Sequence, residues 1–157
     1  MIETIPLPVT DDPVDRAFWQ ACLEGRLLVQ RCGDCGHVQH PPRAMCPVCR
    51  SMELGWSECV GTGTIWSFTV PRPPLLPAFA GLVPYVVVIV EPDDFPGIRI
   101  VGALAGIEGN GIGGIDPETI AIGGPVRLTF VSLADDVALP CWAPVAADGS
   151  LEKDAQQ

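Results

Sequence analysis

Four of the seven cysteines stand in two Cys-x-x-Cys pairs, a pattern suited to metal binding. Cys32 is paired with Cys35 and Cys46 with Cys49, and ten residues separate the two pairs. Two tight turns of this kind can place four thiolates tetrahedrally around a Zn²⁺ ion, about 2.3 Å from each sulfur. Since four thiolates leave no coordination position free, such an ion stabilises the fold and does not catalyse. The spacing therefore predicts one structural zinc ion.

Other uses of these four thiols remain open. Iron accepts the same tetrahedral set of sulfur ligands as zinc. A disulfide pair or a redox-active dithiol is a further alternative. His37 and His40 flank the cysteine pairs, and we expect both to be exposed loop residues, not ligands.

The start of the chain bears on which of these alternatives applies. Residues 1–15 are acidic and rich in proline, without the apolar stretch of a secretion signal. The sequence also lacks a run of about 18 apolar residues, so we expect no transmembrane helix. These features favour a cytoplasmic protein, and thiols in a reducing cytosol bind metal more often than they cross-link.

The chain is acidic overall but basic around the cysteines. Its 157 residues carry a formal net charge of −10, which argues against nucleic acid as the main partner. Residues 16–50 nevertheless hold a net charge of +3, and Arg31, Arg43 and Arg50 lie close to the cysteines in the sequence. These arginines could recognise a small anion such as a phosphate of coenzyme A. The alternative is that the cysteine-rich segment is a solvated zinc-binding module whose scattered charges recognise no particular ligand.

Short strands are expected to position these residues. The 17 glycines and 17 prolines predict many turns and few long helices. One helix is expected from an aspartate cap at residues 10–13 to Gly25. Strands at residues 27–31 and 54–60 would hold the two cysteine pairs between them.

The rest of the sequence predicts a β domain. Strands are expected at residues 61–70, 85–91, 98–104, 126–131 and 138–142, with one helical turn at 116–120. The unbroken β-branched run at 85–91 predicts a central strand buried on both faces. Five strands with a helical turn after the third fit a small closed barrel, the oligonucleotide/oligosaccharide-binding fold or OB-fold. A short β-sandwich is the alternative.

The fold class expected is therefore mainly β, in four segments. Residues 1–26 form an N-terminal helical segment, residues 27–58 a zinc ribbon, residues 59–145 a five-stranded OB-fold domain and residues 146–157 a polar tail.

We find no catalytic constellation in the sequence. Cys22, Cys59 and Cys141 are single cysteines, and the two histidines lie beside the metal cysteines, so none of the three has an obvious base. Residues 109–114 match G-x-G-x-x-G, but a dinucleotide site needs a long helix after the motif. The chain is predicted not to be an enzyme by itself.

Two groups of apolar residues are candidates for contact with a partner. The proline-rich loop at residues 71–84 carries Leu75, Leu76, Phe79 and Leu82, although surface loops are normally polar. Phe18 and Trp19 are adjacent on the expected helix and cannot both occupy the centre of one apolar stripe. The alternative in both cases is that these residues pack on their own chain.

Taken in order, these features resemble one known family: acyl-CoA-associated proteins with an N-terminal rubredoxin-like zinc ribbon and a C-terminal OB-fold, long classed as a domain of unknown function. The resemblance covers about residues 15–145. A glycine-rich insert around residues 105–115 is longer than is usual in the family. The matching motifs are Phe18-Trp19, Gly25-Arg26-Leu27, Gln30-Arg31-Cys32-Gly33-Asp34-Cys35-Gly36-His37, Pro41-Pro42-Arg43, Cys46-Pro47-Val48-Cys49, Gly61-Thr62-Gly63-Thr64-Ile65-Trp66-Ser67-Phe68-Thr69, Pro84-Tyr85-Val86-Val87 and Ile122-Gly123-Gly124-Pro125-Val126.

The resemblance implies a cytosolic, non-catalytic accessory subunit. Such a subunit binds and stabilises or activates a thiolase-like enzyme, an aldolase or thiolase acting on acyl-CoA thioesters, as in steroid or lipid side-chain degradation. The family's zinc ligands correspond to Cys32, Cys35, Cys46 and Cys49. The alternative is a stand-alone module that itself binds CoA or acyl-CoA, with Arg31, Arg43 and Arg50 on the phosphates. Single-stranded nucleic acid binding is a third, weaker alternative.

Overall fold

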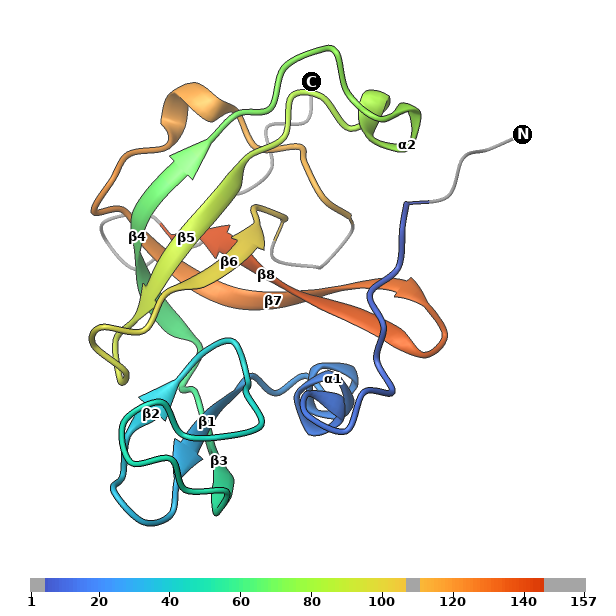
Figure 1. Ribbon diagram of the computed structural model, residues 1–157. Coiled ribbons are helices and arrows are strands. Elements are labelled where there is room, and N and C mark those ends of the chain that lie inside the picture. Colours follow the sequence, from blue (N-terminus) through green and yellow to red (C-terminus); the bar gives the residue numbers. More distant parts are fainter. Residues whose placement is uncertain (1–4, 107–110, 146–157) are drawn as a thin grey trace.

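The computed structural model describes residues 5–106 and 111–145, and its elements form an N-terminal helix, a small sheet and a larger sheet (Figure 1). The larger part of the glycine-rich insert is therefore described, but residues 107–110 and the predicted polar tail lie outside these ranges. The small sheet has the antiparallel order β2-β1-β3. The elements of this first part are α1 (Arg16–Leu23), β1 (Leu28–Cys32), β2 (Val38–Gln39) and β3 (Leu54–Glu58).

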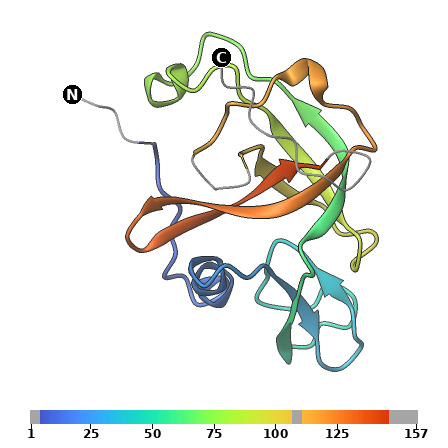
Figure 2. The same cartoon turned by 180° about the vertical axis from the view of Figure 1, so that it is seen from behind.

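The larger sheet contains five antiparallel strands in the order β6-β5-β4-β7-β8. It curls around a common interior in the two opposite views of Figures 1 and 2. Among the described residues, the mainly β class, the N-terminal ribbon and the C-terminal five-stranded domain are confirmed. The elements are β4 (Thr62–Thr69), α2 (Pro77–Ala80), β5 (Val87–Pro92), β6 (Ile100–Ala103), the 3₁₀ turn η1 (Pro117–Thr119), β7 (Pro125–Ala134) and β8 (Val137–Pro144).

The closed barrel predicted from the sequence is wrong in one respect, because the two edge strands do not form a continuous ladder. Directly after β6, a parallel bridge joins Leu104 to Trp142 of β8. Next to it, Ala105 N donates to Trp142 O at 3.0 Å. The Trp142 side chain is fully buried beside Gly102, where an added Cβ would lie 2.9 Å from the indole. The bulky indole thus lies where the edges of the sheet approach each other.

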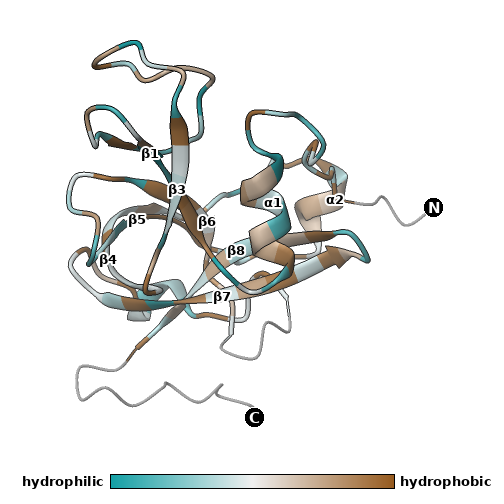
Figure 3. Cartoon of the chain, turned by 90° about the horizontal axis from the view of Figure 1, so that it is seen from below, coloured by the Kyte–Doolittle hydropathy of each residue, from teal (hydrophilic) through white to brown (hydrophobic). Residues whose placement is uncertain are grey.

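One core joins the helix, the ribbon and the larger sheet. Phe18 of α1 and Val29 of β1 belong to the same buried cluster as Val88, Val90 and Trp142. The helix packs against β8 and β1, and Figure 3 shows α1 and β3 on the same side of the larger sheet. Shared burial of this kind fixes the ribbon against the OB-fold domain.

The N-terminal helix begins later than the sequence predicted. Asp12 Oδ1 accepts a hydrogen bond from Val14 N at 2.8 Å, and Asp12 O accepts one from Arg16 N at the same distance. These contacts make residues 12–15 a turn, and the helix itself starts at Arg16. The predicted end is confirmed, since Gly25 follows with φ of 73°, a conformation that glycine adopts without steric cost.

Two details of the strands also differ from the prediction. A short strand, β2, lies within the segment between the cysteine pairs and pairs with β1. Strand β5 is not buried on both faces: Val86, Val88 and Val90 are buried, whereas Val87 and Ile89 are half-buried. The outer face of β5 is therefore apolar and only partly covered.

Candidate metal centre and partner-contact residues

The two cysteine pairs lie on two turns with the same backbone hydrogen bonds. In the first turn, Gly36 N donates to Cys32 O at 3.0 Å and Cys32 N donates to His37 O at 2.9 Å. In the second, Arg50 N donates to Cys46 O and Cys46 N donates to Ser51 O, both at 2.9 Å. Strand β1 leads into the first turn and β3 leaves the second, so the β1–β3 ladder brings the two turns together.

The sulfur atoms have the spacing of a tetrahedral metal site. All four Sγ atoms lie within 4.8 Å of one another. The Cys32–Cys49 and Cys35–Cys46 separations are 3.5 and 3.7 Å, close to the roughly 3.8 Å between sulfurs bound tetrahedrally to zinc at about 2.3 Å. None of the seven cysteines is in a disulfide. The residues present therefore fit zinc, and the predicted ligands are brought together.

Backbone amides point at the sulfurs and favour their thiolate form. The amides of Cys35 and Asp34 lower the pKa of Cys32 to about 6. The amides of Cys49 and Val48 lower the pKa of Cys46 in the same way. The amides of His37 and Ser51 face the other two sulfurs, but burial together with neighbouring thiols outweighs them. The net effect raises the pKa of Cys35 and raises that of Cys49 to about 12. Amide hydrogen bonds of this kind support metal-bound thiolates.

The two turns carry different residues at one position where the backbone φ is positive. Gly36 has φ of 73° and the equivalent Arg50 has φ of 63°. Arg50 is the one non-glycine residue with positive φ in the described part of the chain. Such a conformation is unfavourable for a residue with a Cβ.

The expectation that both histidines are exposed loop residues is wrong, because both are half-buried and His40 packs against the helix. Its ring lies 5.6 Å from that of Phe18, and its Nδ1 is buried without a hydrogen-bond partner among the described residues. Burial lowers the pKa of His40 to about 4. Sequence patterns could not predict this contact, because Phe18 is 22 positions away from His40 along the chain.

The three single cysteines are poor nucleophiles. Burial raises the pKa of Cys22 to about 12 and that of Cys141 to about 11. Burial and the nearby Asp94 carboxylate raise the pKa of Cys59 to about 12. All three thiols therefore stay protonated near neutral pH and behave as small apolar residues.

The three arginines proposed to bind an anion do not form one cluster held by contacts. Arg31 Nε donates to Ser57 Oγ at 2.9 Å on the β1–β3 ladder. Arg43 lies in the loop between the turns, where its backbone N donates to Gln30 Oε1 at 2.9 Å. Arg50 is part of the second turn. All three residues are exposed.

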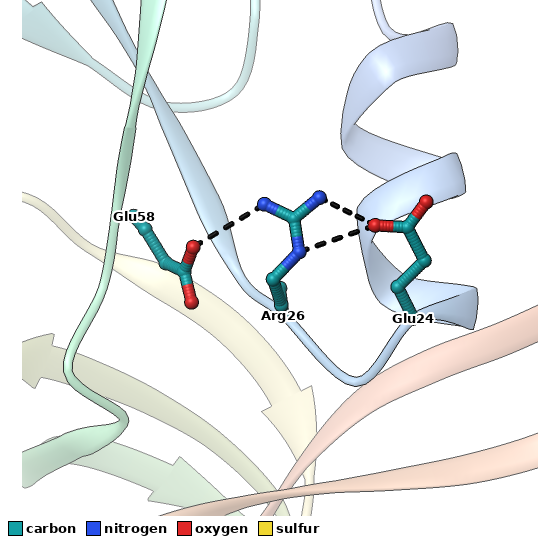
Figure 4. A network of polar contacts seen from close by, with 3 residues as sticks. All are labelled: Glu24, Arg26 and Glu58. Carbon is teal, nitrogen blue, oxygen red and sulfur yellow. Dashed lines mark hydrogen bonds and ion pairs between the residues drawn. The ribbon is translucent and has the colours of Figure 1, made fainter.

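A fourth arginine connects the helix to the ribbon. Figure 4 shows Arg26 between Glu24, which follows α1, and Glu58 at the end of β3. Arg26 Nη1 lies 3.2 Å from Glu58 Oε2 and Arg26 Nε lies 3.2 Å from Glu24 Oε2. All three side chains are well exposed, so water and salt weaken the ion pairs.

The proline-rich loop is less exposed than its sequence suggests. Leu76 is 64% exposed, but Leu75, Phe79 and Leu82 are half-buried. The Phe79 ring stacks on that of Tyr85 with 6.1 Å between centroids. The loop therefore folds partly back on the chain, with Leu76 as its main apolar protrusion.

The adjacent aromatic residues of α1 have different surroundings. Phe18 is 6% exposed and belongs to the core. Trp19 contacts Phe18 edge-on, with 5.1 Å between ring centroids, and lines a surface groove. Phe18 lines the same groove, and Trp19 also packs against the core, so contact of either residue with a partner stays a prediction.

In the described ranges, no helix has both the length and the apolar character needed to cross a membrane.

Comparison with known proteins agrees with this architecture. Residues 19–55 match the model of the ChsH2 rubredoxin-like zinc ribbon domain, and residues 56–131 match that of the ChsH2 C-terminal OB-fold domain. In solved structures, a chain of the "Ltp2-ChsH2(DUF35) aldolase" superposes with a TM-score of 0.73 at 33% identity. That match covers 87% of this chain and 98% of the other.

Curated relatives carry two kinds of name. The "3-oxo-4,17-pregnadiene-20-carboxyl-CoA hydratase alpha subunit" of Mycobacterium tuberculosis is 33% identical over 81% of this chain. The present chain spans only 36–37% of the length of the relatives named as hydratase subunits. A "DUF35 domain-containing scaffold protein" of Methanothermobacter thermautotrophicus is 33% identical over 70% of this chain and 75% of its own length. The chain therefore belongs to the ChsH2 (DUF35) family, in which a rubredoxin-like zinc ribbon precedes a C-terminal OB-fold domain.

Proposed function

We propose that this protein is a non-catalytic accessory subunit of a thiolase-like enzyme acting on acyl-CoA thioesters, such as an aldolase or thiolase of steroid or lipid side-chain degradation. The observation that carries the proposal is the match to nearly the full length of a chain in the Ltp2-ChsH2(DUF35) aldolase. Relatives named as scaffold proteins support a role in assembly. In this proposal the chain stabilises or activates its partner.

The chemistry of the described residues supports a non-catalytic role. The single cysteines are buried and protonated. Of the two histidines, His40 has a pKa of about 4 and His37 lies beside the metal cysteines. We further propose that Cys32, Cys35, Cys46 and Cys49 hold one structural Zn²⁺ ion per chain, with the amide hydrogen bonds around the sulfurs fixing the two turns.

Co-expression with a thiolase-like acyl-CoA enzyme tests the function. We expect a stable complex whose activity neither chain shows alone. An enzyme that is fully active without this chain, or that does not co-purify with it, would contradict the proposal. Metal analysis of the purified chain should give one zinc per chain, and a visible-absorbing iron species would overturn the zinc assignment.

A stand-alone CoA- or acyl-CoA-binding module remains the second candidate, favoured by the exposed Arg31, Arg43 and Arg50. Calorimetric titration of the isolated chain with CoA and with an acyl-CoA separates the two. Micromolar binding supports the module, and no heat up to millimolar ligand removes it.

A further inference from the structure

The four cysteines of the two metal-binding turns differ in their access to solvent. In each turn the first cysteine is buried, with Cys32 2% and Cys46 0% exposed. The second cysteine of each turn, Cys35 or Cys49, is an exposed residue. The three single cysteines, by contrast, are all buried. A dissolved oxidant therefore meets the second cysteine of each turn first.

The exposed cysteine of each turn has its sulfur beside the buried sulfur of the other turn. Cys49 Sγ lies 3.5 Å from Cys32 Sγ, and Cys35 Sγ lies 3.7 Å from Cys46 Sγ. The β1–β3 ladder extends to the pair of Cys32 and Leu54. Backbone hydrogen bonds therefore help to hold the two turns together even when the metal leaves.

Thiolates this close can be oxidised by a peroxide in two balanced steps. The exposed thiolate attacks one peroxide oxygen, so that an S–O bond forms, the O–O bond breaks and hydroxide leaves. The buried thiolate of the other turn then attacks the sulfenic sulfur, so that an S–S bond forms, the S–O bond breaks and a second hydroxide leaves. Two protons convert the hydroxides to water. Each sulfur loses one electron, the peroxide is reduced, and the zinc ion loses two of its four ligands.

We propose that the zinc site is a peroxide-sensitive clip, in which oxidation joins the two turns through a Cys32–Cys49 or a Cys35–Cys46 disulfide and releases the zinc ion. The disulfide replaces the metal as the cross-link between the turns, so the ribbon stays closed while the zinc leaves. This inference rests on the proposed zinc site and is independent of the partner enzyme.

The positions of three arginines allow the disulfide pattern to be measured directly. Trypsin cleaves after Arg31, Arg43 and Arg50, so residues 32–43 and residues 44–50 become separate peptides. Each peptide carries both cysteines of one turn and no other cysteine. A disulfide between the turns joins the two peptides, whereas a disulfide within a turn leaves them separate.

The first test treats the zinc-loaded chain briefly with hydrogen peroxide, then alkylates the remaining thiols in denaturant and digests the chain with trypsin. Mass spectrometry should find the two peptides joined, and fragmentation should place the link between one exposed and one buried cysteine. A disulfide within either peptide, or a link between the two exposed cysteines, would overturn the proposal.

The second test follows the metal in the same reaction. The chain should start with one zinc, and a chain without zinc would overturn the zinc site on which the inference rests. Hydrogen peroxide should then release zinc at least about tenfold faster than it oxidises the thioether of Met52, a residue that is 67% exposed and not a ligand. Zinc release no faster than Met52 oxidation would overturn the proposal.

The control variant for both tests is Cys141→Ala, which removes a buried sulfur outside the metal site. It should form the same disulfide and release zinc within about twofold of the wild-type rate. Loss of the disulfide in this variant would show that a single cysteine takes part and would overturn the proposed pairing.

The third test asks whether the disulfide replaces the metal as a cross-link. The oxidised, metal-free chain should melt about 5 °C or more above the reduced, metal-free chain, because a disulfide restricts the unfolded state. Dithiothreitol and added zinc should restore one zinc per chain. Equal melting temperatures, or irreversible oxidation of the ligands to sulfonic acids, would overturn the proposal.

Discussion

At the scale of single residues, the two metal-binding turns offer a matched comparison. Gly36 and Arg50 occupy equivalent positions and both have positive φ. A Cβ added at Gly36 would meet no atom within 4 Å, so a substitution there changes only the backbone energy.

We expect Gly36→Ala to lower the free energy of unfolding of the zinc-bound chain by about 1 kcal/mol, and Arg50→Gly to raise it by about 0.5 kcal/mol. The gain at Arg50 is smaller because glycine also increases the entropy of the unfolded chain. Urea unfolding of both variants measures the difference. Opposite signs support the equivalence of the turns, and a loss in both variants would show that the Arg50 side chain itself is stabilising.

His40 gives a pH dependence whose sign can be worked out. Burial lowers its pKa from 6.5 to about 4. Between these values the unfolded chain binds a proton that the folded chain does not, so stability is complete above about pH 6.5 and falls as the pH drops toward 4.

His40 alone should therefore remove about 1.4 kcal/mol of stability between about pH 7.5 and about pH 5.5. Unfolding of the zinc-loaded chain at both pH values, compared with His40→Asn, isolates the effect. The variant should lose less stability over this range than the wild type. Equal losses would mean that other groups cause the pH dependence.

At the scale of the elements, β4 and β5 approach closely at one glycine. A Cβ at Gly63 would lie 2.7 Å from both Glu91 O and Val90 Cγ1. Real Cβ atoms do not approach backbone oxygens this closely, so the two strands must separate to admit a side chain.

Gly63→Ala should lower the free energy of unfolding by about 2 to 3 kcal/mol. Gly55→Ala on β3 is the control, because the nearest atom to its added Cβ is 3.9 Å away, an ordinary contact. Thermal unfolding of both variants checks the prediction. Similar melting temperatures would show that β4 and β5 adjust without cost.

Local patterns predicted the metal centre and most strands. The Cys32 turn is closed by a hydrogen bond from Gly36 N to Cys32 O, so its ligands and its geometry come from a few consecutive residues. The same holds for Gly25, which ends the helix. Such features depend little on the rest of the fold and can be recognised in the sequence.

Features made by distant residues could not be predicted. A bulge between Ile65 and Ser67 interrupts the pairing of β4 with β5. Trp66, within this bulge, is 55% exposed, and Arg99 lies 3.7 Å over its ring. The groove combines Trp19, His40 and Val101 from three parts of the chain. The hydrophobic periodicity of a single segment does not indicate which distant elements pack together.

At the scale of the whole molecule, the zinc ribbon and the OB-fold domain share one hydrophobic core, so the stability of both depends on the same metal ion. Phe18 and Val29 are buried in one cluster with Val88 and Trp142, and Cys59 N donates to Leu27 O at 2.8 Å where β3 leads toward β4. Loss of the metal therefore affects more than the two turns.

Cys46→Ser should abolish zinc binding and lower the free energy of unfolding of the entire chain by about 3 kcal/mol or more. Cys141→Ala removes a buried sulfur outside the metal site and should leave the zinc content unchanged. Metal analysis and circular dichroism of both variants check this. Unfolding of the ribbon alone, with the larger sheet intact, would contradict a shared core.

The ribbon segment His40-Pro41-Pro42 lies between β2 and the second metal-binding turn, and it also forms a wall of the groove. Any molecule that binds this wall only when the ribbon is folded must, by thermodynamic reciprocity, also tighten zinc retention. At equilibrium, a chelator should therefore remove zinc from the assembled complex only at a higher concentration than it needs for the free chain. An ion that takes no part in the chemistry would in this way report on quaternary assembly.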